Sequence, residues 1–180
     1  TPPGPDPTPT PASRPASTPT PARAPVPVPV EQLDQLLHGQ HGDPHSILGA
    51  HPAADGSGVT VRVLRPFAET VTIRHGAAPS PDGSLETPLT HEHGGVWVGV
   101  LPLAQTPDYR ISVTYPDGAH HVTDDPYRFL PSLGETDLHL VNEGRHEQLW
   151  TVLGAHVHRY TGGLEGDVVG TSFAVWAPRA

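Results

Sequence analysis

Short apolar stripes with a period of two residues constrain the fold of this chain more than any other feature of its sequence. They occur in four segments: 59–64, 71–73, 96–100 and 109–115. Pro- and Gly-rich turns lie between them, as at 81–84, and Pro116-Asp117-Gly118 predicts a hairpin into 119–123. Strands this short, about ten residues apart, predict a mainly β chain with an antiparallel, immunoglobulin-like β-sandwich over residues 43–130.

Helical spacing flanks the predicted sandwich on both sides. Leu33, Leu36 and Leu37 recur at helical intervals, so we expect an N-terminal helical segment at 30–42. After the sandwich, we expect a helical linker at 131–155. It would hold one helix capped by Thr136 and a second over 145–153, with Trp150 buried between domains.

Proline dominates the first thirty residues, where 12 of the 24 prolines lie among Thr, Ala, Ser and Val. Such a segment cannot bury enough apolar surface to offset the entropy lost on ordering, and proline removes backbone donors. We therefore expect residues 1–29 to be a disordered tail with polyproline II character that serves as a spacer or tether. A docking segment for a proline-binding module is the alternative.

Charge and composition exclude several classes of function. The first thirty residues carry two Arg and one Asp, which leaves eight Arg against 18 acidic residues, a net charge of −10. A body this acidic is a poor partner for nucleic acid. The chain has no cysteine, hence no disulfide scaffold or thiolate chemistry. Without an apolar run of membrane-spanning length or a secretory leader, we expect a cytoplasmic monomer with no membrane contact.

Two short patterns recur in the same order. Leu48-Gly49-Ala50-His51 reappears 105 residues later as Leu153-Gly154-Ala155-His156, and the strand that begins after Gly58 reappears after Gly170. Repetition of a supersecondary pattern predicts two tandem sandwiches. Because Phe173 and Val175 form an apolar face with no strand following, we expect 156–180 to be the truncated start of the second sandwich, represented by its first strand.

Several of these segments, taken in order, resemble one enzyme family. DPHSILGAH at 43–51 and DPYRF at 125–129 resemble the entry and exit of the first N-terminal module of glycogen (1,4-α-glucan) branching enzymes. Residues 137–156 resemble the linker into a second, starch-binding-like module, and GTSFAVWAP at 170–178 resembles its first strand. The doubled arrangement is similar to the actinobacterial long form, and the resemblance covers about 38–180.

The resemblance implies a parent glycosyltransferase that cleaves α-1,4-glucan chains and transfers them to form α-1,6 branches in glycogen. In relatives, the catalytic site lies on a (β/α)₈ barrel, and the reaction follows a retaining mechanism that uses two carboxyl groups. None of the family's catalytic motifs occurs in these 180 residues, so we assign no catalytic residue. The expected role of this region is to position the barrel and influence chain transfer. The alternative is a non-catalytic β-sandwich that binds α-glucan or a partner protein.

Local chemistry points to no metal or cofactor. Asp124 and Asp125 are adjacent, so in a strand they face opposite ways and would not form a pair of catalytic carboxyl groups. The histidine pairs 91/93 and 156/158 have the spacing to clamp a transition ion, but neither has a third ligand nearby. We therefore expect surface histidines and no metal site.

Sugar binding is the remaining local function, and it would use exposed aromatic rings. The candidates are Trp97, Tyr109, Tyr115, Tyr127 and Trp150. Trp97 points opposite to Val96 and Val98, so we expect one sheet face to bury the valines and the other to present the ring as a substrate-binding platform. Packing of this ring under a loop or a neighbouring domain is the alternative.

Overall fold

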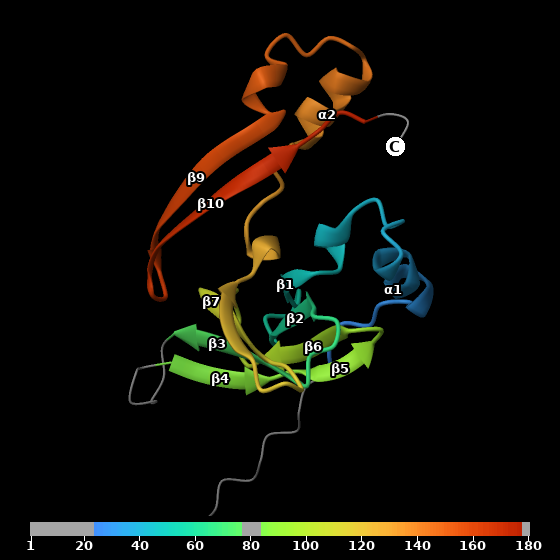
Figure 1. The fold of residues 1–180 in the computed structure, drawn as a ribbon. Coiled ribbons are helices and arrows are strands. Elements are labelled where there is room, and N and C mark those ends of the chain that lie inside the picture. Colours follow the sequence, from blue (N-terminus) through green and yellow to red (C-terminus); the bar gives the residue numbers. More distant parts are fainter. Residues whose placement is uncertain (1–23, 77–83, 178–180) are drawn as a thin grey trace, which may run out of the picture.

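Residues 24–76 and 84–177 are described by the computed structural model, which shows two packed sheets and a separate hairpin (Figure 1). The first sheet has the strand order β1-β2-β6-β5 and the second the order β4-β3-β7-β8; β9 and β10 pair only with each other. All paired strands are antiparallel. The predicted mainly β, antiparallel sandwich is therefore confirmed.

The strands have the following bounds: β1 (Gly49–Pro52), β2 (Val59–Leu64), β3 (Thr70–Gly76), β4 (Ser84–Pro88), β5 (Thr90–His93), β6 (Val96–Leu101), β7 (Tyr109–Thr114), β8 (His120–Asp124), β9 (Gly154–Gly163) and β10 (Gly166–Ala174). The sequence pattern located β2, β3, β6, β7 and β8 but not β1, β4, β5 or β9. The predicted turn at 81–84 lies almost wholly outside the described residues.

Helices in the described residues are short. They are α1 (Val30–Leu37), α2 (Glu135–Asn142) and three 3₁₀ turns, η1 (Pro44–Ser46), η2 (Pro126–Arg128) and η3 (Leu149–Thr151). None of them has both the length and the apolar character needed to cross a membrane. The predicted helix over 145–153 is wrong, because α2 ends before Gly144 at positive φ and only η3 forms beyond it.

The sandwich core lies between the two four-stranded sheets. Alternate residues of β2, β3, β6 and β7 point inward, as the period-two stripes predict. The buried cluster consists of Val59, Val61, Val63, Val71, Ile73, Leu89, Trp97, Leu101, Tyr109, Ile111 and Val113. This cluster fixes which face of each strand is inside, so register errors would expose it.

A second cluster covers the outer face of the first sheet. Leu33 and Leu36 of α1 pack on Val96 of β6, together with Ile47 and Leu48. Both faces of β6 are therefore covered, one by the opposing sheet and one by α1. This accounts for a strand that is buried at Val96, Trp97 and Val98 alike.

The last residues of the predicted tail lie against the same sheet. The Val26 N–H donates to Thr60 Oγ1 at 3.1 Å, and Arg62 donates to the Val26 carbonyl at 2.5 Å. Arg62 is buried and also pairs with Glu92 at 2.7 Å. Residues 24–29 are thus held on β2, which corrects the predicted disorder there; residues 1–23 of the predicted tail lie outside the described residues.

The hairpin β9–β10 repeats the pairing of β1–β2. Gly49 pairs with Arg62, and Gly154 pairs with Ala174, so the first strand is offset by 105 residues and the second by 112. The next three pairs in each copy correspond with the same offsets. The expectation that a single strand represents the second copy is therefore wrong, because that strand, β10, pairs with β9, which precedes it in the chain.

The two copies also share their turn geometry. Gly49 has φ +93° and Gly154 φ +98°. His51 Nε2 lies 3.1 Å from the Leu48 carbonyl, and the corresponding imidazole in the second copy lies 2.9 Å from the corresponding carbonyl. The recurring LGAH segment thus builds the same entry into a strand twice.

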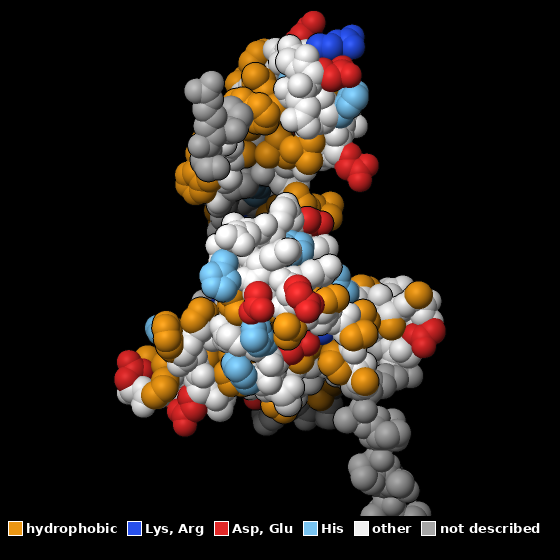
Figure 2. All heavy atoms as spheres, turned by 90° about the vertical axis from the view of Figure 1, so that its right-hand side faces the viewer, with side chains coloured by type: hydrophobic (Ala, Val, Ile, Leu, Met, Phe, Trp, Pro, Cys, Tyr) orange, Lys and Arg blue, Asp and Glu red, His pale blue; other side chains and the backbone are white. Residues whose placement is uncertain are grey.

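Burial separates the two copies. Val61 is 0% exposed, whereas Phe173, its counterpart in the hairpin, is 75% exposed. Figure 2 shows hydrophobic side chains gathered over the part of the molecule above the sandwich, beyond a narrow waist. The exposed apolar residues there are Leu138, Leu149, Trp150, Val157, Val169, Phe173, Val175 and Trp176.

Candidate functional site

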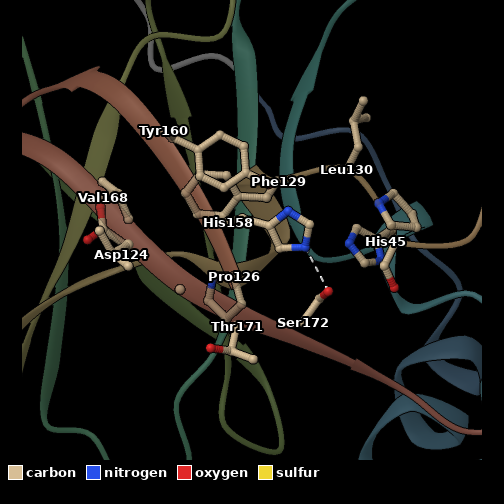
Figure 3. Close-up of a pocket in the computed structure, with 14 residues that line it drawn as sticks. His45, Asp124, Pro126, Phe129, Leu130, His158, Tyr160, Val168, Thr171 and Ser172 are labelled. Carbon is tan, nitrogen blue, oxygen red and sulfur yellow. Dashed lines mark hydrogen bonds between the residues drawn. The ribbon is translucent and has the colours of Figure 1, made fainter. Parts of the chain in front are cut away.

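A cleft of about 650 Å³ lies where the chain leaves the sandwich and meets the hairpin (Figure 3). One wall is the exit segment from Asp124 to Ser132, which includes η2, and the other is formed by β9 and β10. His45 of η1 lines the same cleft. Its volume lies within the range of small-molecule binding sites.

An aromatic stack forms part of the wall. The rings of Phe129 and Tyr160 are stacked with centroids 4.4 Å apart, and the Arg128 guanidinium lies 4.8 Å from the centroid of the Phe129 ring. Arg128 is itself fixed by the Tyr109 carbonyl at 2.9 Å and by an ion pair with Asp108. Tyr160 remains 41% exposed. The stack therefore holds Tyr160 in place while leaving part of its ring accessible.

Polar groups line the remainder of the cleft. Ser172 of β10 and His158 of β9 lie in hydrogen-bond contact, with 2.8 Å between the hydroxyl oxygen and Nε2 (Figure 3). The carboxylate of Asp124 and the hydroxyl of Thr171 also line it. Such hydroxyl, imidazole and carboxylate groups can donate to or accept from a polar ligand.

The contact between Ser172 and His158 does not amount to a catalytic pair. A serine nucleophile needs a base that a third group orients through its other ring nitrogen. In the described part of the chain, no acidic side chain is hydrogen-bonded to His158. The described residues that line the cleft therefore give no basis for covalent catalysis.

The exit segment is anchored by a buried pair beneath it. The Tyr109 hydroxyl donates to Asp125 at 2.6 Å, and the Tyr127 N–H donates to the other carboxylate oxygen at 3.0 Å. Burial raises the pKa of Asp125 above its usual range, although both hydrogen bonds oppose this shift. Burial also raises the pKa of Tyr109, so its hydroxyl remains a donor.

The far end of the hairpin is anchored on the second sheet. Arg74 of β3 and Arg110 of β7 are direct cross-strand partners, and like charges at such positions repel. Glu165, in the turn between β9 and β10, bridges them, lying 3.3 Å from Arg74 and forming a second ion pair with Arg110. Together with the stack of Phe129 on Tyr160, which lies three residues before the end of β9, this bridge holds the tip half of the hairpin against the sandwich.

Trp97, the residue predicted to bind sugar, lies in the sandwich core. It points opposite to Val96, as expected, but the predicted exposure of its ring is wrong. The side chain is 9% exposed and its Nε1–H donates to the Arg65 carbonyl at 3.2 Å. Alternation could not identify the solvent face because both faces of β6 are covered. Sugar binding by Trp97 itself stays a prediction.

The other aromatic candidates are scattered. Tyr109 is buried. Tyr127 packs edge-on against His45, with 4.9 Å between the ring centroids, and Tyr115 contacts His121 on another part of the sandwich. Trp150, predicted to be buried between domains, is 69% exposed in the described structure.

Phe129 and Tyr160 were missed by sequence reasoning, although they build the cleft. Phe129 lies at the end of the recognised DPYRF segment. Tyr160 lies two residues after His158, so the alternation 156/158/160 could have placed it on one face of a strand. No sequence pattern could bring these two residues together, since the hairpin folds back over the exit segment.

The histidine pairs have separate partners. His93 Nε2 lies 2.7 Å from a carboxylate of α1, whereas His91 accepts a backbone N–H at 3.1 Å. His156 and His158 contact a backbone carbonyl and a serine hydroxyl. Within residues 24–76 and 84–177, no group of three or more His, Asp or Glu side chains has an arrangement that could hold a metal ion.

Comparison with known proteins gives consistent matches. The family model for the N-terminal domain of α-1,4-glucan branching enzyme GlgB matches residues 29–127. The 1,4-α-glucan branching enzyme GlgB of Thermobifida fusca is 51% identical over 149 residues, which is 83% of this chain and 19% of that protein. Its counterpart in Frankia casuarinae is 52% identical over 150 residues, 83% of this chain and 18% of that protein. The chain thus spans about a fifth of the length of these relatives.

Proposed function

The chain belongs to the family of N-terminal domains of the branching enzyme GlgB, and from that premise we propose that it serves a 1,4-α-glucan branching enzyme. The whole protein would cleave α-1,4-glucan chains and transfer them to form α-1,6 branches in glycogen. The family match carries this proposal. No nucleic acid, membrane or cofactor is required for it.

Within that enzyme, this region is a non-catalytic support that positions the catalytic barrel and influences which chains are transferred. The anchoring of the hairpin supports this role. Glu165 holds its tip on Arg74 and Arg110, and the stack of Phe129 on Tyr160 holds β9 a few residues before the tip. Whatever part of the protein is built on β9 and β10 would therefore have a defined orientation relative to the sandwich.

The domain organisation is also a proposal. Its boundaries are a helical segment at 30–42, a first sandwich at 43–130, a helical linker at 131–155 and the start of a second sandwich from 156. The shared register of β1–β2 and β9–β10 supports the second sandwich. In the first copy Val61 and Val63 are core residues, and the corresponding Phe173 and Val175 would occupy the core of the second.

The experiment that tests this function uses the whole enzyme. We expect removal of residues 30–130 to leave branching of amylose measurable but to change the length distribution of transferred chains, read after debranching of the product. Removal of residues 1–23 alone is the control and should change neither property. Absence of branching by the intact enzyme would contradict the assigned reaction, and an unchanged length distribution would contradict the positioning role.

A second candidate role is direct binding of α-glucan by this region. The cleft beside Tyr160 favours it over binding of a partner protein, because the cleft is concave and combines an aromatic wall with polar groups. We also propose that the protein is a monomer.

A further inference from the structure

We infer that the outer face of the first sheet carries a peptide-binding site for an extended segment flanked by prolines, and that residues 24–29 of the same chain occupy it. The site is built from Thr60 and Arg62 of β2 and Glu92 of β5. Its role is to anchor the proline-rich N-terminal part of the chain at a fixed point on the sandwich. This role is independent of glucan binding and of the branching reaction.

The site binds both backbone groups of one residue. The Val26 N–H donates to Thr60 Oγ1 at 3.1 Å, and Arg62 Nη2 donates to the Val26 carbonyl at 2.5 Å. The residues on either side, Pro25 and Pro27, have no N–H that needs an acceptor. A segment that lies on the face of a sheet cannot join its hydrogen-bond ladder, so alternating prolines suit this position.

Glu92 orients Arg62 for this contact. The Nε of Arg62 donates to one carboxylate oxygen of Glu92 at 2.7 Å, and its Nη2 donates to the other at 2.9 Å. The pair reaches across β6, which separates β2 from β5, and Glu92 lies at a register shift in β5. Such irregularities commonly re-aim a side chain. Because the Arg62 side chain is only 2% exposed, the carbonyl of the bound segment serves as an acceptor in place of water.

Packing and backbone conformation also favour a segment flanked by prolines. Val28 packs against the cluster that contains Leu33 of α1 and Val96 of β6. Pro29 has φ −58° and ψ 140°, which lie in the polyproline II region. Prolines restrict the free chain to similar conformations, so less conformational entropy is lost when the segment binds.

The second copy shows that the repeated elements form without this site. The 105-residue offset that relates β1 to β9 also relates α1 to α2 and η1 to η3, so the segment before α2 corresponds to the segment before α1. In the second copy Pro131 replaces Val26 and has no N–H to donate. Ala174 replaces Arg62 and has no guanidinium. Both binding groups are therefore specific to the first copy.

The first test is amide hydrogen exchange at Val26 in the 180-residue chain, followed by NMR. We expect this N–H to exchange at least about tenfold more slowly than in the free hexapeptide of residues 24–29. Arg62→Met removes the donor to the Val26 carbonyl and should speed this exchange at least about fivefold, while the amides of β7 stay protected. Arg65→Met is the matched control, because this guanidinium contacts other parts of the sandwich.

The second test supplies the segment as a separate molecule and leaves the site unsubstituted. In a chain whose residues 24–29 are replaced by Gly and Ser, the free hexapeptide should shift the amide resonances of Thr60, Arg62 and Glu92, with a Kd of about 1 mM or lower. The same peptide with Val26→Pro lacks the donor and should bind at least about fivefold more weakly. An unprotected Val26 amide, equal exchange in the two arginine variants, no binding of the peptide, or equal binding of both peptides would each overturn the inference.

Discussion

The pairs β1–β2 and β9–β10 have the same register, the same glycine conformation and the same histidine contact, yet their surroundings differ. In the first pair Val61 is buried by the opposing sheet, whereas in the second Phe173 is exposed. The pairing is therefore specified by the local LGAH segment and strand pattern. Burial is specified by the elements that cover the strands, and only the first pair has such cover among the described residues.

The largest expected effect comes from shortening the two equivalent apolar side chains. Val61→Ala leaves a cavity in a close-packed core and should lower the free energy of unfolding by about 2–4 kcal/mol. Phe173→Ala removes an exposed ring and should change it by less than about 0.5 kcal/mol. Urea unfolding of both variants measures the difference. Similar losses in both would mean that the face of Phe173 is covered in solution.

The two equivalent glycines provide a comparison at fixed backbone geometry. An alanine at either Gly49 or Gly154 must adopt a positive φ, which costs about 1–2 kcal/mol in both copies. A Cβ at Gly49 would also lie 2.8 Å from the Tyr127 carbonyl oxygen, whereas nothing lies within 4 Å of one at Gly154.

We therefore expect Gly49→Ala to cost about 1–3 kcal/mol more than Gly154→Ala. Native-state hydrogen exchange, resolved at β1–β2 and at β9–β10, measures each copy separately. Equal costs would show that the exit segment moves away from Gly49 without penalty.

The exit segment should also give the first copy a pH response that the second lacks. Because burial raises the pKa of Asp125 in the folded chain, the folded state binds this proton more tightly than the unfolded state does. The stabilisation is complete below about pH 4, the usual carboxyl range, and is lost as the pH rises through the raised pKa.

Asp125→Asn removes this titration and keeps an oxygen for the Tyr127 N–H. Relative to that variant, the unsubstituted chain should become less stable as the pH rises from 4 to 7, measured by urea unfolding at several pH values. Parallel pH profiles for the two proteins would contradict the raised pKa.

The sequence predicted the elements whose residues alternate regularly and left out those defined by contact. The stripes at β2 and β7 located the sandwich because one side of each strand faces the core. Alternation failed at Trp97, since α1 and the opposing sheet cover both sides of β6. The cleft could not be predicted from the sequence for a different reason. Phe129 and Tyr160 are 31 residues apart, and only the folding back of the hairpin brings them together.

The smallest expected effect concerns the tip of the hairpin, through which the uncovered copy is held on the covered one. Glu165→Gln removes the charge that bridges the cross-strand neighbours Arg74 and Arg110, which keep their ion pairs with Glu86 and Asp124. Because Glu165 is 46% exposed, solvent weakens the ion pairs, and the loss should be only about 0.5–1 kcal/mol. It should appear as faster amide exchange in β9 and β10, and it should diminish at high salt.

Asp167→Asn is the matched control, because it removes an ion pair of similar exposure that stays within the hairpin. Asp167 lies 3.1 Å from Arg159 of β9 and has no ion pair with the described residues of the sandwich. If Glu165 acts by holding the hairpin on the second sheet, its substitution alone should also loosen the cleft and weaken any ligand bound there. Equal acceleration of exchange in both variants would instead mean that Glu165 stabilises the hairpin locally, and the orientation of the second copy would then depend on the Phe129–Tyr160 stack.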